Sequence, residues 1–476
     1  MSSHLIWPVI YLLLHISVMV RVLAVEGKDP ASRAAWVIVL IFVPAVGILA
    51  YLLFGEPWIT FRSRRFAGDA AITLIPHMAD APAASDQLPP QFRAAFDICQ
   101  QLAGCPPVAG NTAELAADSN AAIDGMVRDI DAAQHSIHIS FYIWLTDASG
   151  LKVVAALQRA ARRGVSCRVI ADGVGSRRLI RSAHWAAMRD AGIRLCVSMK
   201  IWRGLVWAGN RVDLRNHRKI VVVDNHVTWC GSQNCADAEF RVKPRFAPWV
   251  DIMLRLEGPV ARQNQLLFAS DWLAEAGESL HALLAAPILQ EASDGFTAIA
   301  FGTGPTSEPG AMSSVFVGLL YAATREVVIS NPYFVPDQQL LAALIACARR
   351  GVSTTLILPA LNDSLLVGAI SKAHYSLLVR AGVRLFEFHA GLLHAKTLVV
   401  DGMVALVGSA NMDRRSLDLN YENNVLLYDV TLVQQIRQRQ DAWLTQSDAV
   451  EPARVLGRPL LRRLADNAAT VVGPLM

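Results

Sequence analysis

A polar motif occurs twice in this chain with the same internal spacing. Each copy reads His-x-Lys, four residues, Asp, six residues and then Gly-Ser-x-Asn. The two copies are His217, Lys219, Asp224, Gly231, Ser232, Asn234 and His394, Lys396, Asp401, Gly408, Ser409, Asn411. Identical spacing at two distant places indicates one structural unit that the chain uses twice.

The repeat extends beyond the motif. Residues 161–166 (ARRGVS) return unchanged as residues 348–353, and each copy follows a helical apolar pattern and precedes a β-branched run. In each copy the glycine is typical of the residue that ends a helix. The pattern predicts a duplicated α/β fold, with a first domain over 113–290 (motif 212–239) and a second over 291–476 (motif 389–416).

Each motif is expected to lie on a β-hairpin. Residues 217–223 (HRKIVVV) become fully apolar, as a buried central strand does. Side chains two positions apart on a strand share a face, so each histidine points the same way as its lysine. Asp224-Asn225 and Asp401-Gly402 then have the composition of tight turns.

The N-terminus accounts for much of the chain's 53% hydrophobic content. Residues 35–54 contain no charge and are long enough to cross a bilayer, and a second apolar run extends over residues 5–24 if it continues past Arg21. A cleaved signal peptide is the alternative for the first run, but no Lys or Arg precedes it. We expect a transmembrane helical hairpin over residues 1–60, whose orientation the balanced flanking charges leave open.

Residues 61–112 read as a linker after the membrane region. The seven cysteines contain no C-x-x-C pair and are typical of reduced thiols, which favours a cytoplasmic catalytic part. A net charge of +4 gives no indication of a nucleic-acid partner.

The residue types of the motif suit phosphodiester chemistry. One imidazole can attack phosphorus and the other can protonate the leaving alcohol, while Lys219 and Lys396 neutralise the non-bridging oxygens. Ser232, Asn234, Ser409 and Asn411 are candidates for further hydrogen bonds to the phosphate. Which histidine attacks is open, and we favour His217 as nucleophile and His394 as acid and base.

Four acidic residues have less certain roles. Asp224 and Asp401 are either turn formers or members of the active site, since Asp is common in turns for local reasons. Asp251 and Glu422 are candidates to accept a hydrogen bond from the second nitrogen of a histidine, and solvated surface acids are the alternative. No metal or other cofactor is expected, because lysine is no metal ligand at neutral pH and no His/Cys/carboxylate cluster is visible.

These residues resemble the doubled His-Lys-Asp signature of the phospholipase D superfamily. Four segments look more narrowly like bacterial cardiolipin synthases: 44–56 (PAVGILAYLLFGE), 331–337 (NPYFVPD), 392–401 (LLHAKTLVVD) and 412–422 (MDRRSLDLNYE). The resemblance implies two phospholipase D-like α/β/α sandwich domains that share one pocket. It also implies metal-independent conversion of two phosphatidylglycerol molecules into cardiolipin and glycerol, through a phosphatidyl-histidine intermediate, at the bacterial inner membrane as a multi-pass protein.

Alternatives within the superfamily are a hydrolytic phospholipase D and a phosphatidyltransferase with another acceptor. A nuclease is a further alternative, which the membrane segments disfavour. A scaffold without activity is disfavoured because both histidines and both lysines are present. The expected partners are anionic phospholipids (phosphatidylglycerol and cardiolipin) and the bilayer; no nucleic-acid partner is expected, and the oligomeric state is open. Two basic segments suit lipid contact, with ordinary packing as the alternative: the loop 200–216 and the C-terminal stretch containing Arg454, Arg458, Arg462 and Arg463 between leucines.

Overall fold

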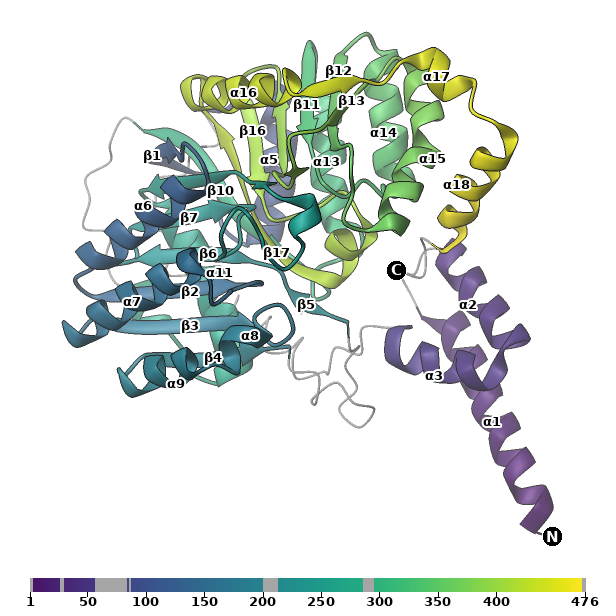
Figure 1. The fold of residues 1–476 in the computed structure, drawn as a ribbon, viewed down its shortest axis with the longest axis horizontal. Coiled ribbons are helices and arrows are strands. Elements are labelled where there is room, and N and C mark those ends of the chain that lie inside the picture. Colours follow the sequence, from purple (N-terminus) through teal and green to yellow (C-terminus); the bar gives the residue numbers. More distant parts are fainter. Residues whose placement is uncertain are drawn as a thin grey trace.

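A continuous β-sheet runs through both halves of the chain in the computed structural model (Figure 1), which describes residues 3–25, 30–55, 84, 87–199, 213–285 and 295–472. Among these residues the sheet has 16 strands, in the order β18-β13-β12-β11-β15-β16-β17-β10-β1-β9-β7-β6-β2-β3-β4, with β5 paired to β17. The halves join where β1 pairs antiparallel with β10. Counted outward from this junction, the order β1-β9-β7-β6-β2-β3-β4 corresponds to β10-β17-β16-β15-β11-β12-β13, and β18 extends the second half at its edge.

The first half contributes the following strands and helices: β1 (Val108–Leu115), α6 (Ser119–Ala132), β2 (Ser136–Phe141), α7 (Ala148–Arg162), β3 (Ser166–Asp172), α8 (Arg177–Ile180), α9 (Ala183–Asp190), β4 (Arg194–Ser198), β5 (Arg215–Asn216), β6 (Lys219–Val223), β7 (Val227–Gly231), the 3-10 helix Pro244–Phe246, β8 (Trp249–Val250), β9 (Met253–Glu257), α11 (Val260–Ala276) and α12 (His281–Ala285). Helices α6 and α7 pack on one face of the sheet, and α11 packs on the other.

The second half repeats this order: β10 (Phe296–Thr303), α13 (Ala311–Ala322), β11 (Glu326–Ser330), α14 (Gln338–Arg349), β12 (Ser353–Pro359), α15 (Leu365–Ala381), β13 (Arg384–Phe388), β14 (Leu392–Leu393), β15 (Thr397–Val400), β16 (Val404–Gly408), the π-helix Arg415–Leu419, β17 (Asn420–Tyr428), α16 (Val430–Leu444), β18 (Ser447–Ala449), α17 (Pro452–Leu456) and α18 (Leu460–Val472). The expected duplicated α/β/α architecture is confirmed.

The sequence repeats fall at matching places. Gly164 and Gly351 follow α7 and α14 with φ of 89° and 88°, a left-handed conformation that glycine adopts without strain. Both motif hairpins turn through two residues of positive φ, Asp224-Asn225 and Asp401-Gly402. This is the backbone that a two-residue hairpin requires, so the turn predictions are confirmed.

Residues 90–112 differ from the linker expected over 61–112. Helix α5 (Pro90–Ala103) packs on the second half, where its Phe92 and Phe96 are fully buried against α13 and the sheet. Strand β1 then forms the junction of the sheet. The apolar spacing on α5, which the sequence analysis did not weigh, is the signal that was missed.

Among the N-terminal residues that the structure describes, one helix is long and apolar enough to cross a bilayer, α1 (Ser3–Ala24). The straight second span expected over residues 35–54 is instead two helices, α2 (Pro30–Phe42) and α3 (Pro44–Phe54). Proline lacks an amide hydrogen and disfavours helical geometry in the residue before it, so the helix breaks at Val43. The two helices fold back on each other, with the rings of Trp36 and Tyr51 5.2 Å apart.

Candidate active site

Two short parallel ladders bring the motif of each half against the other half. Strand β5, just before His217, pairs with the start of β17, and β14, just before His394, pairs with β8. Backbone bonds continue both ladders, from the His217 amide to the Tyr421 carbonyl and from the His394 amide to the Val250 carbonyl. Each histidine is therefore positioned by a strand of the opposite half.

Each histidine also contacts a carboxylate of the opposite half. The Nδ1 of His217 lies 2.8 Å from Oε2 of Glu422, and the Nδ1 of His394 lies 2.6 Å from Oδ1 of Asp251. All four side chains are buried. The two acids that the sequence analysis singled out thus cross the junction between the halves, a pairing that the sequence did not indicate.

The electrostatics favour neutral imidazoles on ionised carboxylates. Burial lowers the pKa of His217 and of His394 to about 4 each. Burial opposes ionisation of Asp251 as well, but the charge and hydrogen bond of His394 lower the pKa of this carboxyl to about 2. Each Nδ1–H then donates to its carboxylate, which leaves the Nε2 lone pair of each ring free for chemistry.

The two lysines lie beside the histidines. Lys219 Nζ donates to the His217 carbonyl at 2.7 Å, and Lys396 Nζ donates to the His394 carbonyl at 2.5 Å. Burial lowers the pKa of Lys219 to about 7 and that of Lys396 to about 8. Each lysine also lowers the pKa of the other half's histidine, so the four groups interact as one cluster.

The motif serines have a different place from the one expected. Ser232 Oγ donates to Asp251 at 2.6 Å, and Ser409 Oγ donates to Glu422. Each hydroxyl proton is therefore committed to the carboxylate behind a histidine rather than to a phosphate. Ser416 adds a second bond to Glu422 at 2.8 Å. Phosphate binding by Ser232 and Ser409 therefore stays a prediction, and the contacts that these serines make here are to the carboxylates.

The motif asparagines remain available for a ligand. Asn234 and Asn411 are both buried, and neither amide nitrogen has a hydrogen-bond partner among the described residues. The Oδ1 of Asn411 also lacks one, whereas the Oδ1 of Asn234 accepts from the Ile143 amide. A buried oxygen without a partner is costly, so a ligand that donates a hydrogen bond would stabilise the Oδ1 of Asn411, while the two amide nitrogens can donate to a ligand.

Asp224 and Asp401 lie at the far end of their hairpins from the histidines. The Asp224 carboxylate accepts from the backbone amides of residues 134, 135 and 136, where β2 begins. Asp401 accepts from the amides of residues 324, 325 and 326, where β11 begins. Of the two roles left open by the sequence, this geometry is that of a turn former.

Aromatic rings flank both histidines, and the sequence analysis gave them no role. The Tyr142 ring lies 4.9 Å from the His217 ring, and the Trp249 ring lies 4.5 Å from the His394 ring. Tyr333, within the NPYF segment, lies edge-on to His394 at 6.4 Å. Asp413 is a further buried acid, whose pKa burial raises to about 6. For Asp413 the available signal was its position just after the second motif, and for Tyr333 its place in the NPYFVPD segment, whereas Tyr142 and Trp249 lie apart from both motifs.

Two other expectations concern the surroundings of the site. Within the described ranges, no group of three or more His, Cys, Asp or Glu side chains could hold a metal ion. Most of the basic and aromatic loop 200–216 lies outside the described residues, including Trp202, Arg203, Trp207 and Arg211. Its last part, from Asp213, leads into β5.

Comparisons with known proteins agree with this architecture. A family model described as "Cardiolipin synthase, PLD-like domain" matches residues 126–270 and 316–443, and a "Phospholipase_D-nuclease N-terminal" model matches residues 8–56. Cardiolipin synthase A of Klebsiella pneumoniae (strain 342) is 35% identical over 481 residues, covering 99% of this chain and 98% of the relative. Cardiolipin synthase A of Escherichia fergusonii is 34% identical with the same coverage.

Among solved structures, phosphatidylserine synthase of Haemophilus influenzae Rd KW20 superposes with a TM-score of 0.60 at 17% identity. The match covers 80% of this chain and 100% of that one. At this identity the likeness establishes the fold alone.

Proposed function

The chain belongs to the family of phospholipase D-like cardiolipin synthases, and we propose that it joins two phosphatidylglycerol molecules into cardiolipin and glycerol. Membership makes it a phosphatidyltransferase of the phospholipase D superfamily and a membrane-associated bacterial protein. The observation that carries the proposal is the pair of buried histidines, each with Nδ1 on a carboxylate of the opposite half and with Nε2 free of any hydrogen bond to a described residue.

In the first step, the Nε2 of His217 attacks the phosphorus of one phosphatidylglycerol. A phosphatidyl-histidine bond forms, the bond to the headgroup glycerol breaks, and His394 gives its proton to the leaving oxygen. His394 gains the needed proton when substrate binds, because the phosphodiester's negative charge opposes the desolvation that holds its pKa at about 4. Glycerol then leaves.

In the second step, the neutral His394 takes a proton from a headgroup hydroxyl of another phosphatidylglycerol. That oxygen attacks phosphorus, the bond to His217 breaks, and cardiolipin is the product. Throughout both steps Lys219 and Lys396 lie where they can neutralise the non-bridging oxygens, with the free amides of Asn234 and Asn411 beside them. The same residues run the reaction in either direction.

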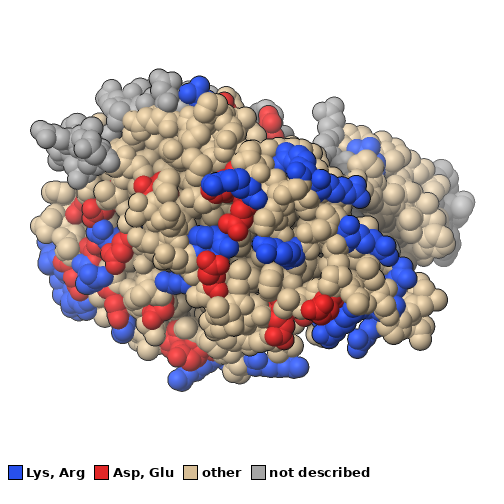
Figure 2. Space-filling view, turned by 90° about the horizontal axis from the view of Figure 1, so that it is seen from above, with Lys and Arg blue, Asp and Glu red and all other residues tan. Residues whose placement is uncertain are grey.

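The proposal also concerns place and partners. We place the protein in the bacterial inner membrane as a multi-pass protein, with the two catalytic halves in the cytoplasm and with anionic phosphatidylglycerol and cardiolipin as ligands. All seven cysteines are free, six of them buried, which suits a reducing compartment. On the face shown in Figure 2, Lys and Arg are interspersed with Asp and Glu, which does not favour a nuclease.

The direct test supplies the purified enzyme with phosphatidylglycerol alone and identifies the lipid products by mass spectrometry. Cardiolipin with one glycerol released per molecule is the expected result. Phosphatidic acid without cardiolipin would instead identify a hydrolase and overturn the proposal.

A further inference from the structure

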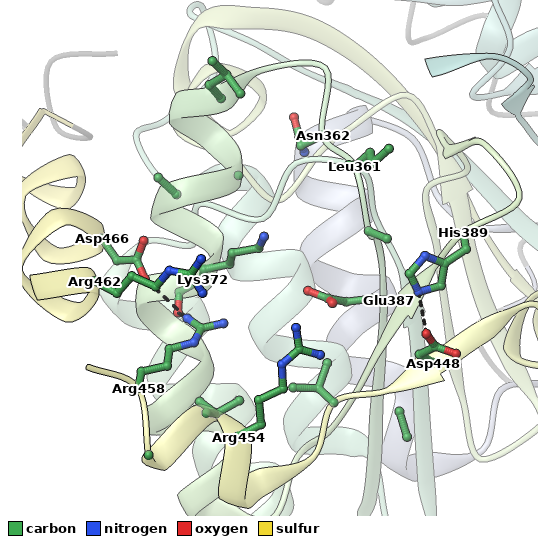
Figure 3. A pocket seen from close by; sticks show the side chains of 18 of the residues that line it. Leu361, Asn362, Lys372, Glu387, His389, Asp448, Arg454, Arg458, Arg462 and Asp466 are labelled. Carbon is green, nitrogen blue, oxygen red and sulfur yellow. Dashed lines mark hydrogen bonds and ion pairs between the residues drawn. The ribbon is translucent and has the colours of Figure 1, made fainter. Parts of the chain in front are cut away.

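A second basic cavity lies outside the catalytic cluster, between α15, the edge strands β13 and β18, and α17–α18 (Figure 3). Its volume is about 720 Å³, within the range of roughly 300–1,000 Å³ that holds small ligands. Neither histidine nor lysine of the two motifs lines it. The loop 360–364 separates it from the catalytic site, since Asp363 of that loop bonds the hydroxyl of Tyr333 beside His394.

The wall formed by α17–α18 is fixed by one arginine. Arg458 Nη1 donates to the Lys372 carbonyl of α15 at 3.2 Å and lies 3.3 Å from Asp466 of α18. Its guanidinium also lies over the Tyr375 ring at 5.8 Å. The C-terminal helices are thus anchored on α15, so the cavity between them is a formed feature of the fold.

Three cations face this cavity without partners. Lys372 is half-buried and Arg454 and Arg462 are exposed, and none of the three side chains has an ion pair or hydrogen bond with a described residue. Figure 3 shows Lys372 and Arg454 reaching into the cavity from opposite walls. The acids there are largely engaged, with Asp448 paired to His389 and Glu387 accepting from Tyr375. Unpaired cations converging on a cavity favour an anionic ligand.

The rim of the cavity is apolar. Leu361 and Leu365 line it and are 58% and 91% exposed. On α18, Leu460, Leu461 and Leu464 are exposed on the helix face opposite to Arg462 and Asp466. Figure 1 shows α18 on the side of the catalytic body from which α1–α3 project. The cations that line the cavity suit a phosphate headgroup, and the exposed leucines around it suit the acyl chains of the same lipid.

We propose that this cavity is a second, non-catalytic site for an anionic phospholipid, whose phosphodiester lies among Lys372, Arg454 and Arg462. The acyl chains leave past Leu361 and Leu365 toward the bilayer, and the leucine face on the far side of α18 contacts the same bilayer. This assigns the basic C-terminal stretch to one bound lipid as well as to the membrane surface.

The test uses the full chain in phosphatidylcholine nanodiscs with a phosphatidylglycerol that carries a diazirine at the start of one acyl chain. After illumination, labelled peptides are mapped. We expect label on residues 361–372 and 454–464. In the triple variant Lys372→Gln, Arg454→Gln, Arg462→Gln, the amount of label on these peptides should fall at least about tenfold. The reason is that each cation near an anionic lipid raises the affinity by roughly a factor of five. Ala369→Phe, which fills the cavity without changing charge, should lower it as well.

A matched control neutralises three exposed arginines elsewhere, Arg177, Arg178 and Arg189, and should keep the label. Excess inorganic phosphate at equal ionic strength should also leave it unchanged. The proposal is overturned if the cavity variants are labelled as strongly as the parent, or if a phosphatidylcholine that carries the same diazirine labels these peptides equally. Displacement of the label by inorganic phosphate would also overturn it, because it would indicate a soluble phosphate compound as the ligand.

Discussion

The motif histidines are held by carboxylates that come from outside their own motifs. Asp251 and Glu422 keep the Nδ1–H of each ring engaged, and Ser232 and Ser409 hold these carboxylates in turn. An amide in place of either carboxylate offers a weaker acceptor and permits the wrong ring tautomer. The two acids are therefore positioning residues in the proposed mechanism.

We expect Asp251→Asn and Glu422→Gln each to lower kcat by about 10³-fold or more, as loss of a histidine-orienting acid does elsewhere. KM should change little, because the phosphate contacts of the lysines remain. Circular dichroism and membrane incorporation should match the parent protein. Wild-type turnover in either folded variant would remove these acids from the mechanism.

The buried lysines predict an alkaline limit on activity. Their pKa values of about 7 and about 8 lie below the ordinary 10.5, so both lose their charge as pH rises through that window. The phosphodiester stays anionic, and its neutralisation is then lost. We expect kcat/KM for phosphatidylglycerol to fall above about pH 8. A flat profile up to pH 10, in an enzyme shown to remain folded, would contradict this assignment.

Among single elements, the motif hairpins show how a residue inside a recurring motif can have a structural role. Asp224 and Asp401 cap the starts of β2 and β11 through three backbone amides each, and both have positive φ. Their carboxylates tie each hairpin turn to the neighbouring strand. The Asp of the motif therefore stabilises the unit that carries His and Lys.

Replacing Asp224 with Ala should lower the free energy of unfolding by about 1–3 kcal/mol, because three backbone amides, one of them half-buried, lose a charged acceptor. Thermal unfolding in detergent measures this. The specific activity of the folded fraction should remain within a few-fold of the parent, and Asp224→Asn, which tolerates the positive φ, serves as the control. Complete loss of activity without a change in stability would return this Asp to the chemistry.

Much of this architecture was readable from the sequence because it is local and repeated. Helix and strand periodicity, the glycines after α7 and α14, and the hairpin turns all follow from near neighbours in the chain. The contact between Asp251 and His394 could not be predicted from the sequence, because it depends on the pairing of β8 with β14 across the junction between the halves. The helix break has a sequence signal in Pro44, but the prediction of one span over residues 35–54 rested on the length and apolar character of that run. The burial of α5 was hidden because its partners lie in the second half.

At the scale of the whole molecule, duplication produces one site from two halves. The sheet joins at β1 and β10, and the exchange of histidine partners across the junction makes neither half complete alone. The apolar N-terminal helix α1 and the proposed lipid cavity on α15 and α18 would then hold this site beside its lipid substrates.

The membrane helices should affect access to lipid more than chemistry. A chain lacking residues 1–55 keeps every described catalytic contact, so it should turn over phosphatidylglycerol in mixed micelles. In vesicles its kcat/KM should drop at least about tenfold, because tethering supplies a high effective concentration. Sedimentation with vesicles provides the binding measurement. Equal activity of both forms on vesicles would show that the anchor is dispensable.

The central claim is that the two halves share one histidine-based transfer of a phosphatidyl group. Its most direct measurement is acid-free quenching of the parent enzyme during turnover of phosphatidylglycerol, followed by mass mapping of the adduct, with the His217→Ala and His394→Ala variants measured beside it. The account predicts a phosphatidyl group on the peptide containing His217, and none in the His217→Ala variant. Continued cardiolipin synthesis by both variants with no adduct on either histidine would contradict it.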